Sequence, residues 1–103
     1  MTETLLLNVD VRGVAYRPPE AQTEASKLNQ SDPLVLVPEP TNEHDNFAVK
    51  VCTEGKLTHI GYLPKGLNVV VHRLLVAGFD VRAHVRTSRP RGLECSVVLV
   101  SDD

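Results

Sequence analysis

The sequence is poor in aromatic residues and has no tryptophan. Two Tyr and two Phe give an aromatic share of 4% among 103 residues. Aliphatic side chains, chiefly Val and Leu, must therefore build the core. The hydrophobic share of 42% and the charged share of 23% are ordinary for a soluble globular protein. The length suits one domain with a modest core, covering residues 1–103.

Cysteine is scarce, and the histidines are scattered. Cys52 and Cys95 cannot make a disulfide framework and lack the spacing of a zinc knuckle. Each falls within a predicted strand, so we expect buried free thiols. The histidines lie in four different predicted elements without His-x-x-x-His spacing: His44, His59, His72 and His84. We therefore expect neither a metal site nor a cofactor.

Long apolar runs and catalytic loops are missing as well. No run approaches the roughly 18 apolar residues of a membrane span, and the N-terminus has no signal-peptide pattern. We therefore expect no membrane association and a cytoplasmic address. The sequence has no Gly-rich phosphate loop and no Gly-x-Ser-x-Gly elbow, and its serines lack an activating context. Catalysis is not expected.

Charge is distributed unevenly although the net charge is only -2. Residues 1–60 carry 5 Lys or Arg and 9 Asp or Glu, a balance of -4. Residues 61–101 carry 6 basic and 2 acidic residues, a balance of +4. A local basic face and a simple scatter of surface charge both fit this distribution.

Short apolar segments bounded by turn residues predict about six strands. They span residues 4–16, 33–40, 46–53, 57–63, 79–87 and 93–101. Prolines flank the second segment, which indicates a position near a sheet edge. Gly55 in "EGK" and the stretch "SRPRG" mark two hairpins, so the sheet is expected to be largely antiparallel.

Two segments have helical patterns. Pro19 suits the first turn of a short helix whose inner side carries Ala21, Ala25 and Leu28. A second helix is predicted over residues 64–79, opened by Pro64 and capped by Gly78. Its apolar stripe is Leu67, Val70, Val71, Leu74 and Leu75, and the residues off the stripe are Asn68, His72 and Arg73. The predicted fold is mostly β with one or two helices (α+β), as a small barrel or curled sheet.

The stretch "PEPTNEHDNFAVKV" (38–51) concentrates polar residues in a turn before a strand. Asn42, His44 and Asp45 are good turn formers, because short polar side chains bond the local backbone. They can alternatively form a ligand site in which Asp45 accepts a hydrogen bond from a hydroxyl group. The residues themselves leave both roles open.

Two further stretches combine an aromatic with a basic residue. "GYLPK" (61–65) places Tyr62 and Lys65 where a strand ends and a helix is expected to begin, a position that suits a phosphate. Alternatively, Pro64 merely starts the helix and Lys65 is solvated. "GVAYR" (13–17) puts Tyr16 and Arg17 at an exposed strand end. They can stack a base and pair a phosphate, or serve as ordinary rim residues.

The order of these pieces resembles the HIRAN domain. "GVAYR" is followed by "VPEPTNEHDNFAVKV", Gly55 and "IGYLPKGLNVVVHRLL". The family signature runs Glu/Asp-Pro, one residue, Asn-Pro-aromatic-Asp, one residue and Asn-Ala-Val/Ile. A strand, a Gly turn, Gly-Tyr/His-Leu-Pro/Lys-Lys and a helix complete it. The resemblance covers nearly all of residues 6–100 and suggests a stand-alone, bacterial member.

The resemblance implies an OB-like β-barrel that binds the 3′ end of single-stranded DNA. By that similarity Asp45 accepts a hydrogen bond from the terminal hydroxyl, and Tyr16 stacks on a base. Arg17 or Lys65 meets phosphates, and His44 takes the place of the signature aromatic. The DNA-binding residues are expected to be Tyr16, Arg17, Asn42, His44, Asp45, Tyr62 and Lys65.

The chain also departs from the signature. Glu43 replaces Pro, His44 the aromatic and Phe47 the later Asn, although Asn46 stands one place earlier. Glu43 puts a negative charge beside a pocket for a polyanion, which should weaken binding. Because Ala15 precedes Tyr16, a basic contact there is expected from Arg17.

The sequence thus predicts a non-catalytic module for single-stranded DNA, preferably 3′-hydroxyl ends, in DNA repair or replication-fork processing. A helicase, nuclease or other DNA-processing protein is an expected partner, with nucleoid association if the source is bacterial. The alternative is a protein-interaction module that has lost the pocket. A pocket framed by Tyr16, His44 and Lys65 favours DNA, and an acidic, filled turn favours the alternative. A metal-dependent hydrolase would need two histidines to converge with Asp45.

Overall fold

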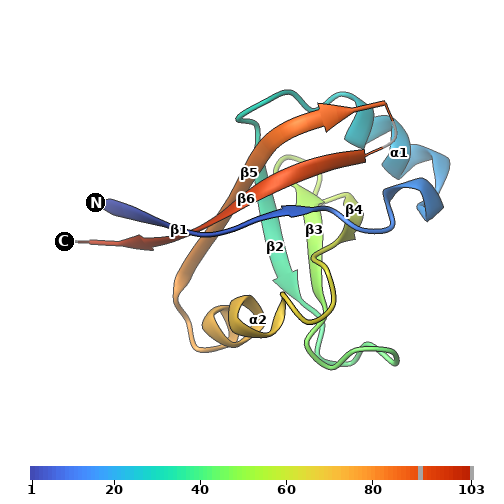
Figure 1. The fold of residues 1–103 in the computed structure, drawn as a ribbon. Coiled ribbons are helices and arrows are strands. Elements are labelled where there is room, and N and C mark those ends of the chain that lie inside the picture. The colour runs from blue at the N-terminus through green and yellow to red at the C-terminus, as the bar shows by residue number, and fades with distance from the viewer. Residues whose placement is uncertain (91, 103) are drawn as a thin grey trace.

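The computed structural model describes residues 1–90 and 92–102. Over these residues the chain is mostly β, with two α-helices and one short 3-10 helix, η1 (Figure 1). The elements are β1 (Thr2–Asp10), η1 (Val14–Tyr16), α1 (Pro19–Ser26), β2 (Pro33–Pro38), β3 (Val49–Thr53), β4 (His59–Tyr62), α2 (Val69–Val76), β5 (Asp80–Arg89) and β6 (Gly92–Ser101). The predicted fold class is confirmed.

The strands form a six-stranded sheet in the order β1-β6-β5-β2-β3-β4. Every neighbouring pair is antiparallel, as predicted. The longest pair, β5 and β6, forms a hairpin in which Arg89 lies opposite Gly92. Arg91, part of the predicted "SRPRG" loop, lies outside the described residues. Figure 1 shows β1 running along β6, so that Thr2 at the start of β1 lies opposite Ser101 at the end of β6.

The predicted edge position of β2 is wrong. β2 pairs with β3 over five register positions and with β5 through Pro33 and Leu34. It therefore lies inside the sheet. The two prolines, Pro33 and Pro38, sit at the strand's two ends, where a missing N–H costs the ladder little. The actual edge strands are β1 and β4.

The two edges of the sheet meet just after β1. Arg12 forms an isolated antiparallel bridge with Tyr62 of β4. The Arg12 N–H donates to the Tyr62 carbonyl at 2.7 Å, and the Tyr62 N–H donates to the Arg12 carbonyl at 2.9 Å. The sheet is therefore curled until its first and last strands touch.

Gly61 permits this contact. A Cβ atom at position 61 would lie 2.6 Å from the Arg12 carbonyl oxygen and 2.6 Å from Cγ1 of Val11. Both distances are far below van der Waals contact, and one of the two atoms belongs to the backbone. A side chain at 61 would force the two edges apart.

The core is aliphatic, as the composition predicts. Its most buried members lie on β3 to β6 and include Val49, Val51, Ile60, Val85 and Val97, each 0% exposed. Both cysteines are buried and free, as expected, and burial raises the pKa of Cys95 to about 12. The two helices lie at opposite ends of the molecule in Figure 1. No helix of the described residues is long and apolar enough to cross a membrane.

The first predicted strand is too long at its C-terminal end. β1 ends at Asp10, and Gly13 adopts a left-handed conformation with φ +80°. The Tyr16 N–H then donates to the Gly13 carbonyl at 3.1 Å, which forms η1. Tyr16 and Arg17 therefore follow a tight turn and do not end a strand.

The second helix begins later than predicted. Gly66 has φ +89°, and its N–H donates to Oδ1 of Asn68 at 3.2 Å, so residues 64–68 form a turn before α2. Lys65 therefore does not stand at a helix N-terminus. The predicted cap at Gly78 is correct, because it has φ +90° and closes a Schellman motif. In that motif the Phe79 N–H donates to the Leu74 carbonyl at 3.0 Å.

The buried side of α2 also differs from the predicted stripe. Val71 is 1% exposed as predicted, but Leu67 and Val70 are 52% and 63% exposed. Asn68 and His72, predicted to point away, are buried instead. Their polar atoms have partners in the loop between β2 and β3, and these partners compensate for burial of polar groups.

We expect Gly61→Ala to lower the free energy of unfolding by about 1–3 kcal/mol, because the new methyl group overlaps backbone at the bridge. The matched control is Gly55→Ala, where a Cβ atom meets nothing within 4 Å. Urea unfolding of both variants checks the difference. Equal stabilities would contradict a steric requirement at position 61.

Candidate functional site

The loop between β2 and β3, residues 39–48, is folded by its own polar side chains. Oδ1 of Asn42 accepts hydrogen bonds from the backbone N–H groups of His44, at 2.8 Å, and Asp45, at 3.0 Å. Oδ1 of Asp45 accepts one from the Phe47 N–H at 2.9 Å. These bonds confirm the predicted turn-forming role of Asn42 and Asp45.

The second oxygen of Asp45 is held from the segment before α2. Nδ2 of Asn68, which is only 1% exposed, donates to Oδ2 of Asp45 at 2.8 Å. This hydrogen bond, followed by that of the Phe47 N–H, holds the pKa of Asp45 below its ordinary value. Asp45 is therefore a carboxylate at neutral pH. Each oxygen keeps a lone pair for another donor.

Contacts from α2 hold the far end of the same loop. His72 places Nδ1 3.1 Å from the Ala48 carbonyl oxygen, and its ring meets Phe47 edge-on at a centroid distance of 5.5 Å. The Arg73 guanidinium lies 5.3 Å from the centroid of the Phe47 ring. Phe47, which departs from the family signature, thus packs against α2.

Asp45 lies on the wall of an open pocket of about 530 Å³. The pocket brings together five of the seven predicted site residues: Asn42, His44, Asp45, Tyr62 and Lys65. They come from the loop, from the end of β4 and from the turn before α2. Lys65 spans two of these segments, because its Nζ donates to the His44 carbonyl at 3.4 Å.

Tyr62 is clamped by an acidic residue behind the pocket. Its hydroxyl donates to Oε1 of Glu39 at 2.9 Å, and Nδ2 of Asn42 donates to the same oxygen at 2.6 Å. The Asn42 hydrogen bond is the main cause that lowers the pKa of Glu39. Burial, and then Glu39, raise the pKa of Tyr62. The Tyr62 hydroxyl is thus engaged, and a ligand would meet the residue through its ring.

The structure does not bring Tyr16 and Arg17 to this pocket. Tyr16 is 92% exposed and lines a neighbouring hollow of about 470 Å³. Nε of Arg17 donates to the carbonyl of His59 at 3.0 Å, which ties the segment before α1 to β4. Arg17 therefore has a structural contact where the sequence suggested a phosphate contact.

Two polar residues that line the pocket, Arg12 and Asn68, are missing from the sequence-based prediction. Arg12 lines the pocket because of the contact between the sheet edges, which no local pattern indicates. Asn68 was assigned to the outer face of a helix that begins too early. A signal did exist, since Asn68 and His72 are spaced i, i+4 and therefore share one side of a helix whose only other polar residue is Arg73.

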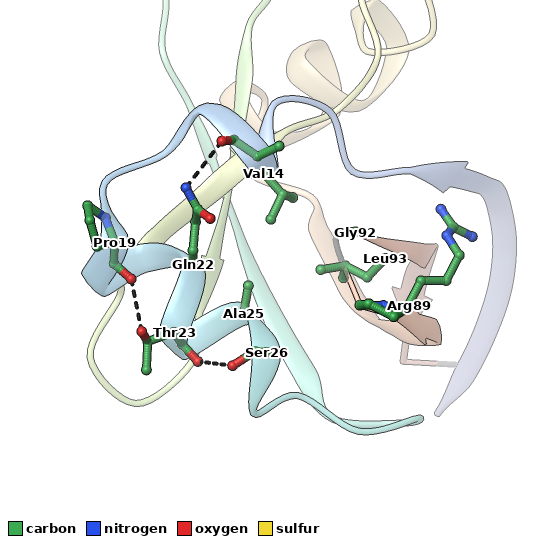
Figure 2. Close-up of a pocket in the computed structure, with 11 residues that line it drawn as sticks. Val14, Pro19, Gln22, Thr23, Ala25, Ser26, Arg89, Gly92 and Leu93 are labelled. Atoms are coloured by element: carbon green, nitrogen blue, oxygen red, sulfur yellow. Dashed lines mark hydrogen bonds between the residues drawn. The ribbon is translucent and has the colours of Figure 1, made fainter.

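A further cavity of about 550 Å³ lies between α1 and the β5–β6 hairpin (Figure 2). Its polar side chains already bond the chain itself. Nε2 of Gln22 donates to the Ala15 carbonyl at 3.1 Å, and Thr23 and Ser26 donate to carbonyls one turn back along the helix. Arg89 on the opposite wall donates to Asp10 at 2.8 Å. The Asp45 pocket is therefore the better candidate.

Among the described residues, no group of three or more His, Cys, Asp or Glu is placed to hold a metal ion. The hydrolase interpretation required two histidines to converge with Asp45. Of the four, His44 lines the pocket, whereas His72 lies buried beneath the loop with its ring turned to Phe47 and Ala48.

Comparison with known proteins places this geometry in context. The profile of the HIRAN domain matches residues 5–101. A crystal structure of a protein from Lactobacillus plantarum superimposes with a TM-score of 0.85 at 21% identity, covering 95% of both chains. The HIRAN domain of human HLTF superimposes with a TM-score of 0.74 at 18% identity, covering 94% of this chain and 78% of that one. No curated protein matches.

We expect Asn68→Ala to destabilise the protein by about 1–3 kcal/mol, because it removes a buried amide that bonds both Asp45 and the Gly66 N–H. Asn46→Ala is the matched control, since Asn46 is exposed in the same loop. Thermal and urea unfolding report the difference. A loss no larger than that of the control would argue against this contact as a support of the loop.

The lowered pKa of Asp45 predicts a pH-dependent contribution to stability. A carboxyl group whose folded pKa is depressed stabilises the fold fully above its unfolded pKa. That contribution is lost as the pH falls below the ordinary value of 3.8 and through the lower folded pKa. Wild type should therefore exceed Asp45→Asn in stability at pH 7, and the gap should close in acid. Urea unfolding between pH 2 and pH 7 measures this difference in stability. A difference that stays constant with pH would contradict the lowered pKa of Asp45.

Proposed function

The chain belongs to the HIRAN domain family, and on this premise we propose that it binds single-stranded DNA at free 3′-hydroxyl ends. Family membership supports DNA binding in general. The 3′-end preference rests on one observation: an ionised carboxylate, Asp45, is held by Asn68 and the Phe47 N–H on the wall of an open pocket. We place this non-catalytic activity in DNA repair or replication-fork processing.

Asp45 supports selectivity through its charge. An ionised carboxylate accepts hydrogen bonds and cannot donate them, so a 3′-hydroxyl group is a suitable partner. A 3′-phosphate or a continuing phosphodiester brings a second negative charge to the same oxygens. The hydrogen bonds to Asp45 fix its orientation before any ligand arrives, which lowers the entropic cost of binding.

The remaining walls supply contacts for a base and a phosphate. His44 is exposed on the pocket rim and Tyr62 offers its ring, so both can lie against a base. Lys65 brings a positive charge to the same pocket. Tyr16 lines the adjacent hollow, and we propose that it stacks on the next base along the strand. Asn42 acts indirectly, because it shapes the turn that carries His44 and Asp45.

Affinity should be modest and only moderately sensitive to salt. The net charge is -2, and Glu43 is an exposed acid next to His44 on the pocket rim. Few phosphates are contacted, and each contributes about -0.7 to the slope of log K against log salt on single strands. A helicase, nuclease or other DNA-processing partner would add binding surface.

One observation favours a second candidate function, a protein-interaction module. Leu67 and Val70 expose 52% and 63% of their surface at the start of α2. Exposed apolar side chains next to one another are common at protein–protein contacts. The Asp45 pocket is nevertheless open, and it holds His44 and Lys65, two of the three residues expected to frame a DNA pocket, while Tyr16 lines the adjacent hollow.

The test is fluorescence anisotropy with short single-stranded oligonucleotides that end in a 3′-hydroxyl or a 3′-phosphate. Wild type should prefer the hydroxyl end by roughly tenfold, the value of one hydrogen bond to a charged group. Asp45→Asn should lose this preference. Asp80→Asn, which removes the same charge from the start of β5, should keep it. Equal binding to both ends would overturn the 3′-end proposal, and no binding even at low salt would favour the protein-interaction module.

A further inference from the structure

The side chain of Arg12 starts from a rigid position on the rim of the Asp45 pocket. Two backbone hydrogen bonds, at 2.7 Å and 2.9 Å, tie Arg12 to Tyr62. The preceding residue is held as well, because the Val11 N–H donates to the Leu93 carbonyl at 2.9 Å. The direction in which the Arg12 side chain leaves the backbone is therefore set by the contact between the two edges of the sheet.

Arg12 also differs from the other described arginines in having an unengaged charge. Its side chain is exposed, and within the described residues its guanidinium has no ion pair, hydrogen bond or ring contact. The others contact a carboxylate, a carbonyl or a ring: Arg17, Arg73, Arg82, Arg86 and Arg89. The nearby acid Asp10 is already paired with Arg89 at 2.8 Å. A guanidinium group without a protein partner is free to bind an anion.

The position of Arg12 links two binding surfaces. Arg12 lines both the Asp45 pocket and the adjacent hollow that holds Tyr16. A strand whose terminal nucleoside meets Asp45 and whose preceding base meets Tyr16 must carry its intervening phosphodiester past Arg12. The charged residues lining the Asp45 pocket are Asp45, Lys65 and Arg12, so without Arg12 the lining has no excess positive charge.

From this geometry we propose that Arg12 binds the 3′-most phosphodiester of the strand, whereas the family resemblance implied Arg17 or Lys65 as the phosphate contact. The proposal rests on the proposed function. A guanidinium presents several N–H donors in a planar fork that matches two oxygens of a phosphate. Arg12 then helps to set how far the terminal nucleoside enters the pocket. Arg17 instead supports β4 through the His59 carbonyl.

The experiment replaces the 3′-most phosphodiester of a short oligonucleotide by an uncharged methylphosphonate. Wild type should bind the modified strand about fivefold more weakly, the loss of one exposed charge-assisted contact. Arg12→Gln should bind both strands equally, at about the affinity of wild type for the modified one. Its salt slope should be shallower by about 0.7. Arg82→Gln is the charge-matched control, since Arg82 pairs with Asp80 on β5.

The outcomes separate this proposal from the function on which it rests. Suppose that wild type prefers the 3′-hydroxyl end and that Asp45→Asn does not, so that the 3′-end proposal holds. If Arg12→Gln then still binds the methylphosphonate strand more weakly than the unmodified strand, Arg12 is not the phosphate contact. The same conclusion holds if Arg17→Gln, and not Arg12→Gln, loses the effect. If wild type binds no single strand at low salt, both proposals fail together. Thermal unfolding of Arg12→Gln verifies that its fold is intact.

Discussion

The backbone contact between Arg12 and Tyr62 is the constraint on which the candidate site depends. It joins the two edges of a six-stranded sheet, and it requires glycine at position 61 because a Cβ atom there would overlap the Arg12 carbonyl. Through this one bridge, Tyr62 from β4 and Arg12 from the segment after β1 become neighbours on the wall of one pocket. The cationic side of the pocket is therefore a consequence of how the sheet curls.

A set of polar contacts forms the opposite wall. The loop between β2 and β3 folds itself through Asn42 and Asp45, but its orientation comes from α2. Asn68 and His72 are buried because the loop offers them partners, and their burial turns Leu67 and Val70 outward. The Asn68 hydrogen bond also holds the pKa of Asp45 below its ordinary value. Fold and site are thus stabilised by shared interactions.

The electrostatics of the pocket suit a ligand with both a donor group and a negative charge. Asp45 presents an acceptor, and Lys65 and Arg12 present positive charge. Glu39 lies behind Tyr62, where its hydrogen bonds with the Tyr62 hydroxyl and the Asn42 amide hold its charge away from the ligand. A nucleic-acid terminus combines a hydroxyl and a phosphate at a short separation. A pocket of this composition is consistent with membership in the HIRAN domain family.

The sequence by itself determined the class of fold, the antiparallel hairpins, the buried thiols, the Gly78 cap and the turn built by Asn42 and Asp45. Each depends on neighbours within a few residues, or on the alternation of apolar side chains, and both can be read locally. The tertiary structure decided the interior position of β2 and the late start of α2. It also decided that Arg12 and Asn68 line the Asp45 pocket. They depend on contacts such as Arg12 with Tyr62 and Asp45 with Asn68, which join segments far apart in the chain. Local periodicity carries no information about which distant backbone or side-chain group a residue will contact. Those long-range contacts decided which residues line the pocket.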